Sequence, residues 1–131
     1  MFLRNELVQA LMEVRDPEPV RTTNVKVVLI WYQLLYRFSV VLESENIYEI
    51  FERCIEKHRG DFPWLPNSLQ NGSNAYLFLD FEDAILDQSF READRATRAL
   101  LGTYIDFLIQ SVGETLTVNL ICNIASRKLI S

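Results

Sequence analysis

Residues 46–60 read NIYEIFERCIEKHRG, and this stretch decides the expected fold class. Its apolar residues recur three and four positions apart, which places them on one side of a helix. They are Ile47, Ile50, Phe51, Cys54 and Ile55. Asn46 and Glu49 have the spacing of a capping box, and Gly60 is expected to cap the other end. The pattern predicts an amphipathic helix whose apolar face other elements must cover.

Further helices are predicted on both sides of this stretch. Residues 3–14 form an amphipathic segment that ends before the prolines at positions 17 and 19. Residues 27–42 are almost entirely apolar and predict a central, mostly buried helix, which Thr22, Thr23 or Asn24 could cap.

A long helix is predicted between Ser89 and Val112. Ser89 and Glu92 have the spacing of a second capping box, and Gly113 is expected to end the helix. Gly102 lies inside it and predicts either a break or a close crossing with another helix.

Two segments fit both a helix and a strand. Residues 76–80 begin with a short apolar run typical of a buried strand, and residues 115–120 alternate like a strand, although helical spacing continues beyond both. We favour helices, and predict an all-α, irregular bundle of five or six helices in a single domain spanning residues 1–131. The alternative is an α+β fold in which these two segments pair.

Composition restricts the function. The net charge is −5, which argues against general affinity for nucleic acid, because such binding depends on Lys and Arg neutralising phosphates. The apolar run at residues 27–42 contains Arg37 and is shorter than the ~20 residues that span a bilayer, so we expect no membrane partner. Two cysteines are too few for a secreted disulfide framework, which favours the cytoplasm.

The acidic residues are concentrated in one part of the chain. Residues 60–90 contain no Lys or Arg but hold five acids: Asp61, Asp80, Glu82, Asp83 and Asp87. The loop at residues 61–74 adds Phe62, Trp64 and Leu65. Exposed aromatic anchors beside charge of one sign are typical of protein interfaces, so we predict that these eight residues bind a basic protein partner. In the alternative, Phe62 and Trp64 fold back onto the core.

Other polar clusters have structural explanations. Cys54 and His58 lie four apart, as in a thiolate–imidazole pair, but both extend an apolar stripe and no second pair completes a metal site. Arg91, Arg95 and Arg98 form one helix face, and Asp87 and Asp94 are placed to pair with them. We therefore expect no catalytic residue, metal or cofactor.

Three functions remain open. The first is a non-enzymatic protein-binding module, specifically an acidic antagonist that masks a basic partner; bacterial immunity proteins are analogous in size and charge. The second is a helical ligand-binding or sensor domain with a pocket formed by Trp31, Tyr32, Tyr36 and Phe38. The third is a thiol enzyme that uses Cys54 with His58. The apolar content of 49% also leaves room for a homodimer on the second or last helix.

Overall fold

The computed structural model describes residues 2–13, 23–67 and 74–126. These residues form an all-α fold with six helices and no strand, which confirms the predicted helical bundle. The helices are α1 (Phe2–Met12), α2 (Thr23–Phe38), α3 (Ser44–His58), α5 (Asn74–Leu86), α6 (Phe90–Val112) and α7 (Glu114–Ala125).

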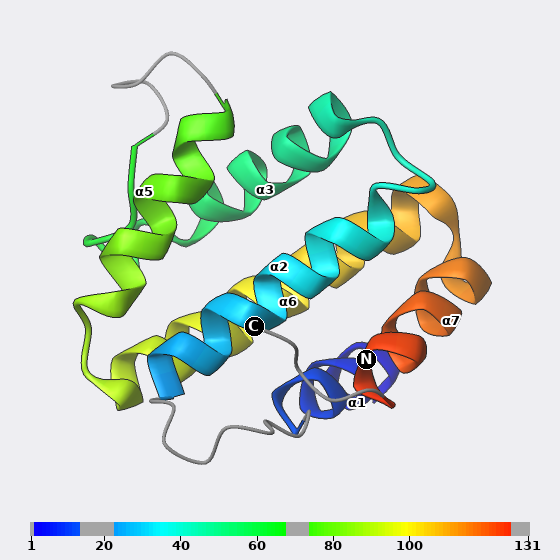
Figure 1. Cartoon of the computed structure of the whole chain (residues 1–131), viewed down its shortest axis with the longest axis horizontal. Coiled ribbons are helices and arrows are strands. Elements are labelled where there is room, and N and C mark those ends of the chain that lie inside the picture. Colours follow the sequence, from blue (N-terminus) through cyan, green and yellow to red (C-terminus); the bar gives the residue numbers. More distant parts are fainter. Residues whose placement is uncertain (1, 14–22, 68–73, 127–131) are drawn as a thin grey trace.

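Helix α6 is the central element of the bundle. It packs against α1, α2, α3 and α7, while α5 packs against α2 and α3. Figure 1 shows α2 in front of α6 and running along it, with α3 and α5 on one side of this pair and α1 and α7 on the other.

Both ambiguous segments are helical, so the hairpin alternative is wrong. Residues 76–80 lie in α5 and residues 115–120 in α7. In α5 the buried residues are Leu77, Phe78, Phe81 and Ile85, which follow helical spacing. The strand-like pattern in each segment covered only five or six residues, whereas the helical spacing of apolar residues continues over the whole length of α5 and α7.

The predicted ends of α3 are wrong at both positions. The helix begins at Ser44, so Asn46 lies inside it, and Glu49 pairs instead with Arg53 at 3.6 Å. The C-cap is Arg59, and the backbone of Gly60 does not enter the left-handed region. Backbone N–H groups that follow the helix cap its C-terminus, because those of Asp61 and Phe62 both donate to the carbonyl of His58.

Helix α6 matches its prediction more closely. The Ser89 hydroxyl accepts a hydrogen bond from the backbone N–H of Glu92 at 3.2 Å, which is half of a capping box. Gly113 ends the helix with a φ of 90°, a conformation that L side chains rarely adopt. At Gly102 the helix does not break; the side chain of Arg4 from α1 lies over it instead.

The start of α2 stabilises the end of α5. Helix α2 ends at Phe38, earlier than predicted. Near its other end, the buried Asn24 side chain donates to the carbonyls of Ile85 and Gln88, at 2.9 and 2.6 Å. These carbonyls belong to the last turn of α5 and to the residue two positions after it, and the Ile85 carbonyl also accepts from the backbone N–H of Gln88 at 3.2 Å. Asn24 thus caps a different helix from the one that contains it.

One aromatic cluster joins four helices at the centre of the core. Trp31 of α2 contacts Phe51 of α3, Phe81 of α5 and Tyr104 of α6, with ring centroids 5.4, 5.7 and 5.5 Å apart. All three contacts are edge-to-face, the geometry that the ring quadrupoles favour. All four side chains are fully buried. The cluster fixes α2 and α6 relative to the pair α3 and α5.

Among the helices that the structure describes, none has the combination of length and apolar character that crossing a membrane requires.

Candidate partner-binding surface

The predicted aromatic anchors are not on the surface. Phe62 and Leu65 are 3% and 4% exposed and belong to the core. Trp64 is half-buried and packs against the same core. The described part of the loop therefore adopts the alternative arrangement, folded back onto the bundle, and offers no exposed apolar anchor.

Polar contacts hold this segment against α6. The indole N–H of Trp64 donates to the Glu92 carboxylate at 2.9 Å. Arg95 pairs with the same carboxylate at 2.9 Å and lies over the Phe62 ring, 4.4 Å from its centroid. The hydrogen bond from Trp64 and the contact with Arg95 lower the pKa of Glu92. Glu92 therefore stabilises the loop, rather than completing the capping box with Ser89.

The arginine face of α6 is occupied by intramolecular contacts. Arg98 pairs with Asp94 at 3.0 Å, as the i, i+4 spacing predicted. Arg91 lies over the ring of Phe90, 6.0 Å from its centroid, rather than in the predicted pair with Asp87.

Helix α5 carries Asp80, Glu82 and Asp83, whereas Asp87 follows its end and Asp61 lies just after α3. Asp61, Asp83 and Asp87 are exposed, whereas Asp80 and Glu82 are half-buried. Helix α5 carries three of the five acids and no basic residue. The structure therefore exposes acids on and after α5, whereas the aromatic residues that were expected to accompany them pack on the core.

Cys54 and His58 do not form an activated pair. Cys54 is fully buried, and burial raises the pKa of its thiol, the opposite of what a reactive thiolate requires. His58 instead contacts the hydroxyl of Thr103 on α6, with 2.7 Å between Nε2 and Oγ1. In the described residues, no three side chains of the His, Cys, Asp and Glu types gather as ligands for a metal ion.

A groove of about 250 Å³ lies between α2, α3 and α5, and we call it the tyrosine groove. Helix α2 contributes one wall and the start of α3 contributes the other. Its principal lining residues are Tyr32, Leu35, Tyr36, Ile47, Tyr48 and Phe78. Most of the groove lining is thus apolar, and the hydroxyl groups of Tyr36 and Tyr48 can donate hydrogen bonds to a partner.

Tyr32 is held in place on this surface. Its ring packs edge-to-face on Phe78 with centroids 5.1 Å apart, and its hydroxyl donates to Glu82 at 2.9 Å. Burial raises the pKa of Tyr32, and the hydrogen bond to Glu82 and the carboxylate charge raise it further. The phenol therefore stays protonated and links α2 to the acidic helix α5.

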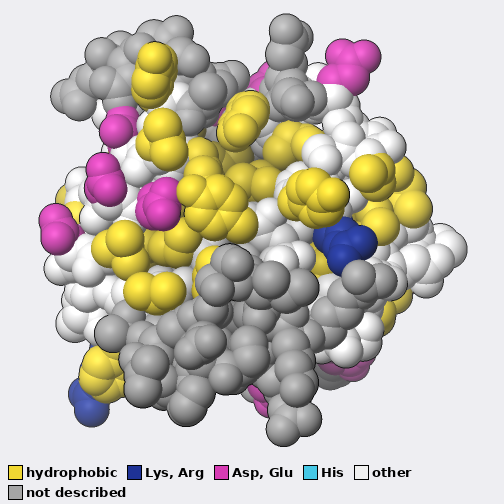
Figure 2. All heavy atoms as spheres, in the orientation of Figure 1, with side chains coloured by type: hydrophobic (Ala, Val, Ile, Leu, Met, Phe, Trp, Pro, Cys, Tyr) yellow, Lys and Arg dark blue, Asp and Glu magenta, His cyan; other side chains and the backbone are white. Residues whose placement is uncertain are grey.

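Exposed apolar side chains extend the groove into a wider face. Tyr36 is 69% exposed on α2, and Val40 follows at 74%. On α5, Tyr76 and Leu79 are 59% and 50% exposed. Figure 2 shows hydrophobic side chains gathered over α2 and α5, with acidic side chains along the α5 edge. Apolar residues bordered by acids on the α5 side thus do occur together, at the tyrosine groove and the face beside it.

Sequence reasoning assigned these residues differently. Tyr32 and Tyr36 were expected to line a ligand pocket with Trp31 and Phe38, but the latter two are fully buried in the core. A signal was present in α5, where Tyr76 and Leu79 share the exposed face with Asp83. A helix face that carries an acid is expected to be exposed to solvent, so apolar residues on the same face indicate an exposed apolar surface.

Comparison with protein-family models, curated proteins and solved structures finds no match to this chain.

Proposed function

We propose that this chain is a non-enzymatic protein-binding module that holds a basic partner segment at the tyrosine groove. The supporting observation is the coincidence, on one face, of exposed tyrosines with a helix that carries acids and no basic residue. Tyrosine is enriched at interfaces because it contributes a large apolar area and a hydrogen bond at low entropic cost.

The chemistry of the groove defines the partner segment. An apolar side chain would fill the space between Tyr32, Tyr36 and Tyr48, and neighbouring Lys or Arg residues would face the acids of α5. The specific form of this proposal is an antagonist that masks the working surface of a basic nuclease, toxin or regulator. Long-range attraction by the acids speeds association, and the rate falls as salt rises.

A small-ligand site in the same groove is the weaker candidate. Pockets that enclose drug-sized ligands have volumes of about 300–1,000 Å³. The tyrosine groove, at about 250 Å³, falls below that range and opens onto an exposed apolar face. A groove of this size suits one or two side chains of a partner better than a whole ligand.

Both cysteines, Cys54 and Cys122, are free, and this supports placing the module in a reducing compartment, the cytoplasm.

The test compares two variants of similar size and exposure. Tyr36→Ala removes a groove residue that is 69% exposed, and Phe90→Ala removes a 60% exposed aromatic ring that does not line the groove. Each tagged variant captures proteins from lysate at low and high salt, and the captured protein is then purified and titrated. We expect one basic partner, bound at least about tenfold more weakly by Tyr36→Ala, unchanged by Phe90→Ala, and weakened by salt.

Two results would overturn the proposal. One is the absence of any captured partner at either salt concentration. The other is a partner whose affinity is the same for Tyr36→Ala and the unmodified chain.

A further inference from the structure

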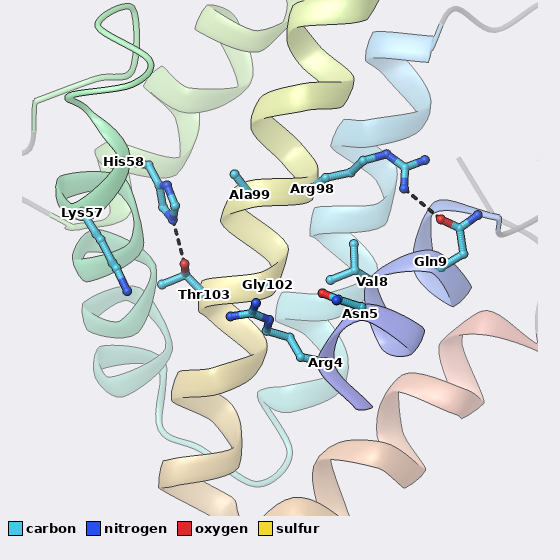
Figure 3. A pocket seen from close by; sticks show the side chains of 10 residues that line it. All are labelled: Arg4, Asn5, Val8, Gln9, Lys57, His58, Arg98, Ala99, Gly102 and Thr103. Atoms are coloured by element: carbon cyan, nitrogen blue, oxygen red, sulfur yellow. Dashed lines mark hydrogen bonds between the residues drawn. The ribbon is translucent and has the colours of Figure 1, made fainter. Parts of the chain in front are cut away.

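A second cavity, larger than the tyrosine groove, lies away from it. It has a volume of about 520 Å³ and lies between α1 and α3, with α6 as its floor. Figure 3 shows this cavity, which we call the basic cleft. The residues that matter for its chemistry are Arg4, Lys57, His58, Arg98, Gly102 and Thr103.

The charge of the basic cleft is opposite to that of the chain. Three cationic side chains and the histidine line it, and its lining contains no Asp or Glu among the described residues. The chain as a whole has a net charge of −5. In Figure 3 the side chains of Arg4 and Lys57 extend toward each other from α1 and α3, across the floor. Their like charges repel each other, and Asp106, which pairs with Arg4, lies outside the lining of the cleft.

Neighbouring groups position the two arginines without using all their donors. Arg4 Nη1 pairs with Asp106 at 2.9 Å. Arg98 pairs with Asp94 through Nε and with Gln9 through Nη1, at 3.0 and 2.9 Å. A guanidinium has five N–H groups, so each arginine keeps donors for a ligand.

Lys57 has a simpler environment. The side chain is exposed, and its ammonium forms no hydrogen bond or ion pair with a described residue. Its three donors are therefore available to an anion in the cleft.

The floor contains a glycine that helix packing does not require. A Cβ on Gly102 would meet only the Arg4 side chain, at an ordinary contact distance of 3.6 Å. Glycine inside a helix costs about 1 kcal/mol relative to alanine. Since no steric conflict excludes alanine, packing does not require the glycine, and the Arg4 side chain lies directly over it on the cleft floor.

His58 and Thr103 complete the polar wall. They contact each other at 2.7 Å, from α3 and α6. Burial lowers the pKa of His58, and the charge of Lys57 lowers it further, so the ring is mainly neutral at neutral pH. Together the two side chains offer a ligand oxygen further hydrogen-bond partners.

We propose that the basic cleft binds the phosphate group of a small phosphorylated molecule. A phosphate presents several oxygens in different directions, which suits donors that converge from α1, α3 and α6. The volume of about 520 Å³ falls in the range of small-molecule sites and leaves room for the rest of the ligand.

The test measures phosphate binding to the full chain. Inorganic phosphate is titrated calorimetrically at constant ionic strength, with chloride as the balancing anion. Lys57→Gln removes a cleft charge that has no described partner, and Lys26→Gln removes the same charge from α2, outside the cleft. We expect saturable binding that Lys57→Gln weakens at least about tenfold and Lys26→Gln changes less than about twofold. The amide resonances of Gly102 and Thr103 should shift during the titration.

Two further probes identify the source of the phosphate. Glycerol phosphate represents a soluble ligand, and vesicles containing phosphatidic acid represent a lipid headgroup. Lys57-dependent binding of glycerol phosphate supports the proposal as stated, whereas binding to the vesicles alone would overturn it in favour of a membrane surface.

Other results would also overturn the site. They are the absence of saturable phosphate binding, or equal losses in Lys57→Gln and Lys26→Gln. The proposal is independent of the protein-binding function, because Tyr36→Ala, which tests the tyrosine groove, should leave phosphate affinity unchanged.

Discussion

The tyrosine groove and the basic cleft share one helix but differ in almost every other respect. The start of α3 gives Ile47 and Tyr48 to the groove, and its end gives Lys57 and His58 to the cleft. The groove is apolar and lies beside an acidic helix, whereas the cleft is cationic. The difference shows that net charge does not define the sign of a local site, because folding brings together residues from distant segments.

The floors of the two sites also differ. Beneath the groove lies the aromatic cluster around Trp31, in which rings from four helices are in contact. The floor of the cleft is one helix with a glycine, covered only by the Arg4 side chain. Changes to the groove floor should therefore affect stability strongly, and changes to the cleft floor should not.

The largest effect is expected at the groove floor. Trp31→Ala removes a fully buried side chain that touches three aromatic rings, and leaves a cavity among four helices. We expect a loss of about 3–5 kcal/mol in the free energy of unfolding, measured by urea denaturation. A loss below about 1 kcal/mol would mean that the cluster does not organise the bundle.

A smaller effect of opposite sign is expected at the cleft floor. Gly102→Ala adds a methyl group at an ordinary contact distance and reduces the conformational freedom of the unfolded chain. We expect the free energy of unfolding to rise by about 0.5–1 kcal/mol, and the melting temperature by about 2–4 °C. If alanine destabilised the chain instead, the close packing of Arg4 on α6 would require the glycine.

The smallest effect is expected from His58. Its pKa is lowered in the folded chain, while in the unfolded chain it returns to about 6.5. Between the two values the unfolded chain binds more protons, so stability falls as pH drops through about 6.5 and levels off below the folded pKa.

Because His58 is the sole histidine in the sequence, its imidazole protons give a single titration curve by NMR. We expect a midpoint below about 6.5 without ligand and a higher midpoint with saturating phosphate, since an anion favours the charged ring. His58→Gln should show a weaker dependence of melting temperature on pH between about 8 and 5. A midpoint above the ordinary value in the free protein would contradict the burial of this ring in the cleft wall.

Periodicity predicted the fold because its signal is local. The apolar stripe of α3 and the cap and stop signals of α6 at Ser89 and Gly113 lie within a few turns of the helices they define. The loop residues Phe62 and Leu65 were harder to place, because their burial depends on the position of α6, more than 25 residues away in sequence. Their apolar character alone is compatible with both an interface and a core.

The candidate sites were predictable to different extents. The acids near α5 are neighbours in sequence, so their concentration was visible before folding. The cations of the cleft come from three separate helices and are Arg4, Lys57 and Arg98. In the sequence each has an acid nearby, so no local excess of positive charge marks it. Only the packing of α1 and α3 on either side of α6 brings them together.

The packing of α1 has a consequence for the order of events during synthesis. Helix α1 lies mainly against α6 and α7, which a ribosome makes roughly 80 residues later. Ribosomes add about 5–20 residues per second, so several seconds pass between the synthesis of α1 and that of α6. During this time the apolar face of α1, with Leu7, Val8 and Leu11, is not covered by α6 or α7. The basic cleft thus forms only after α6 has emerged, and a chain stopped before α6 would leave the buried face of α1 open to aggregation or to a chaperone.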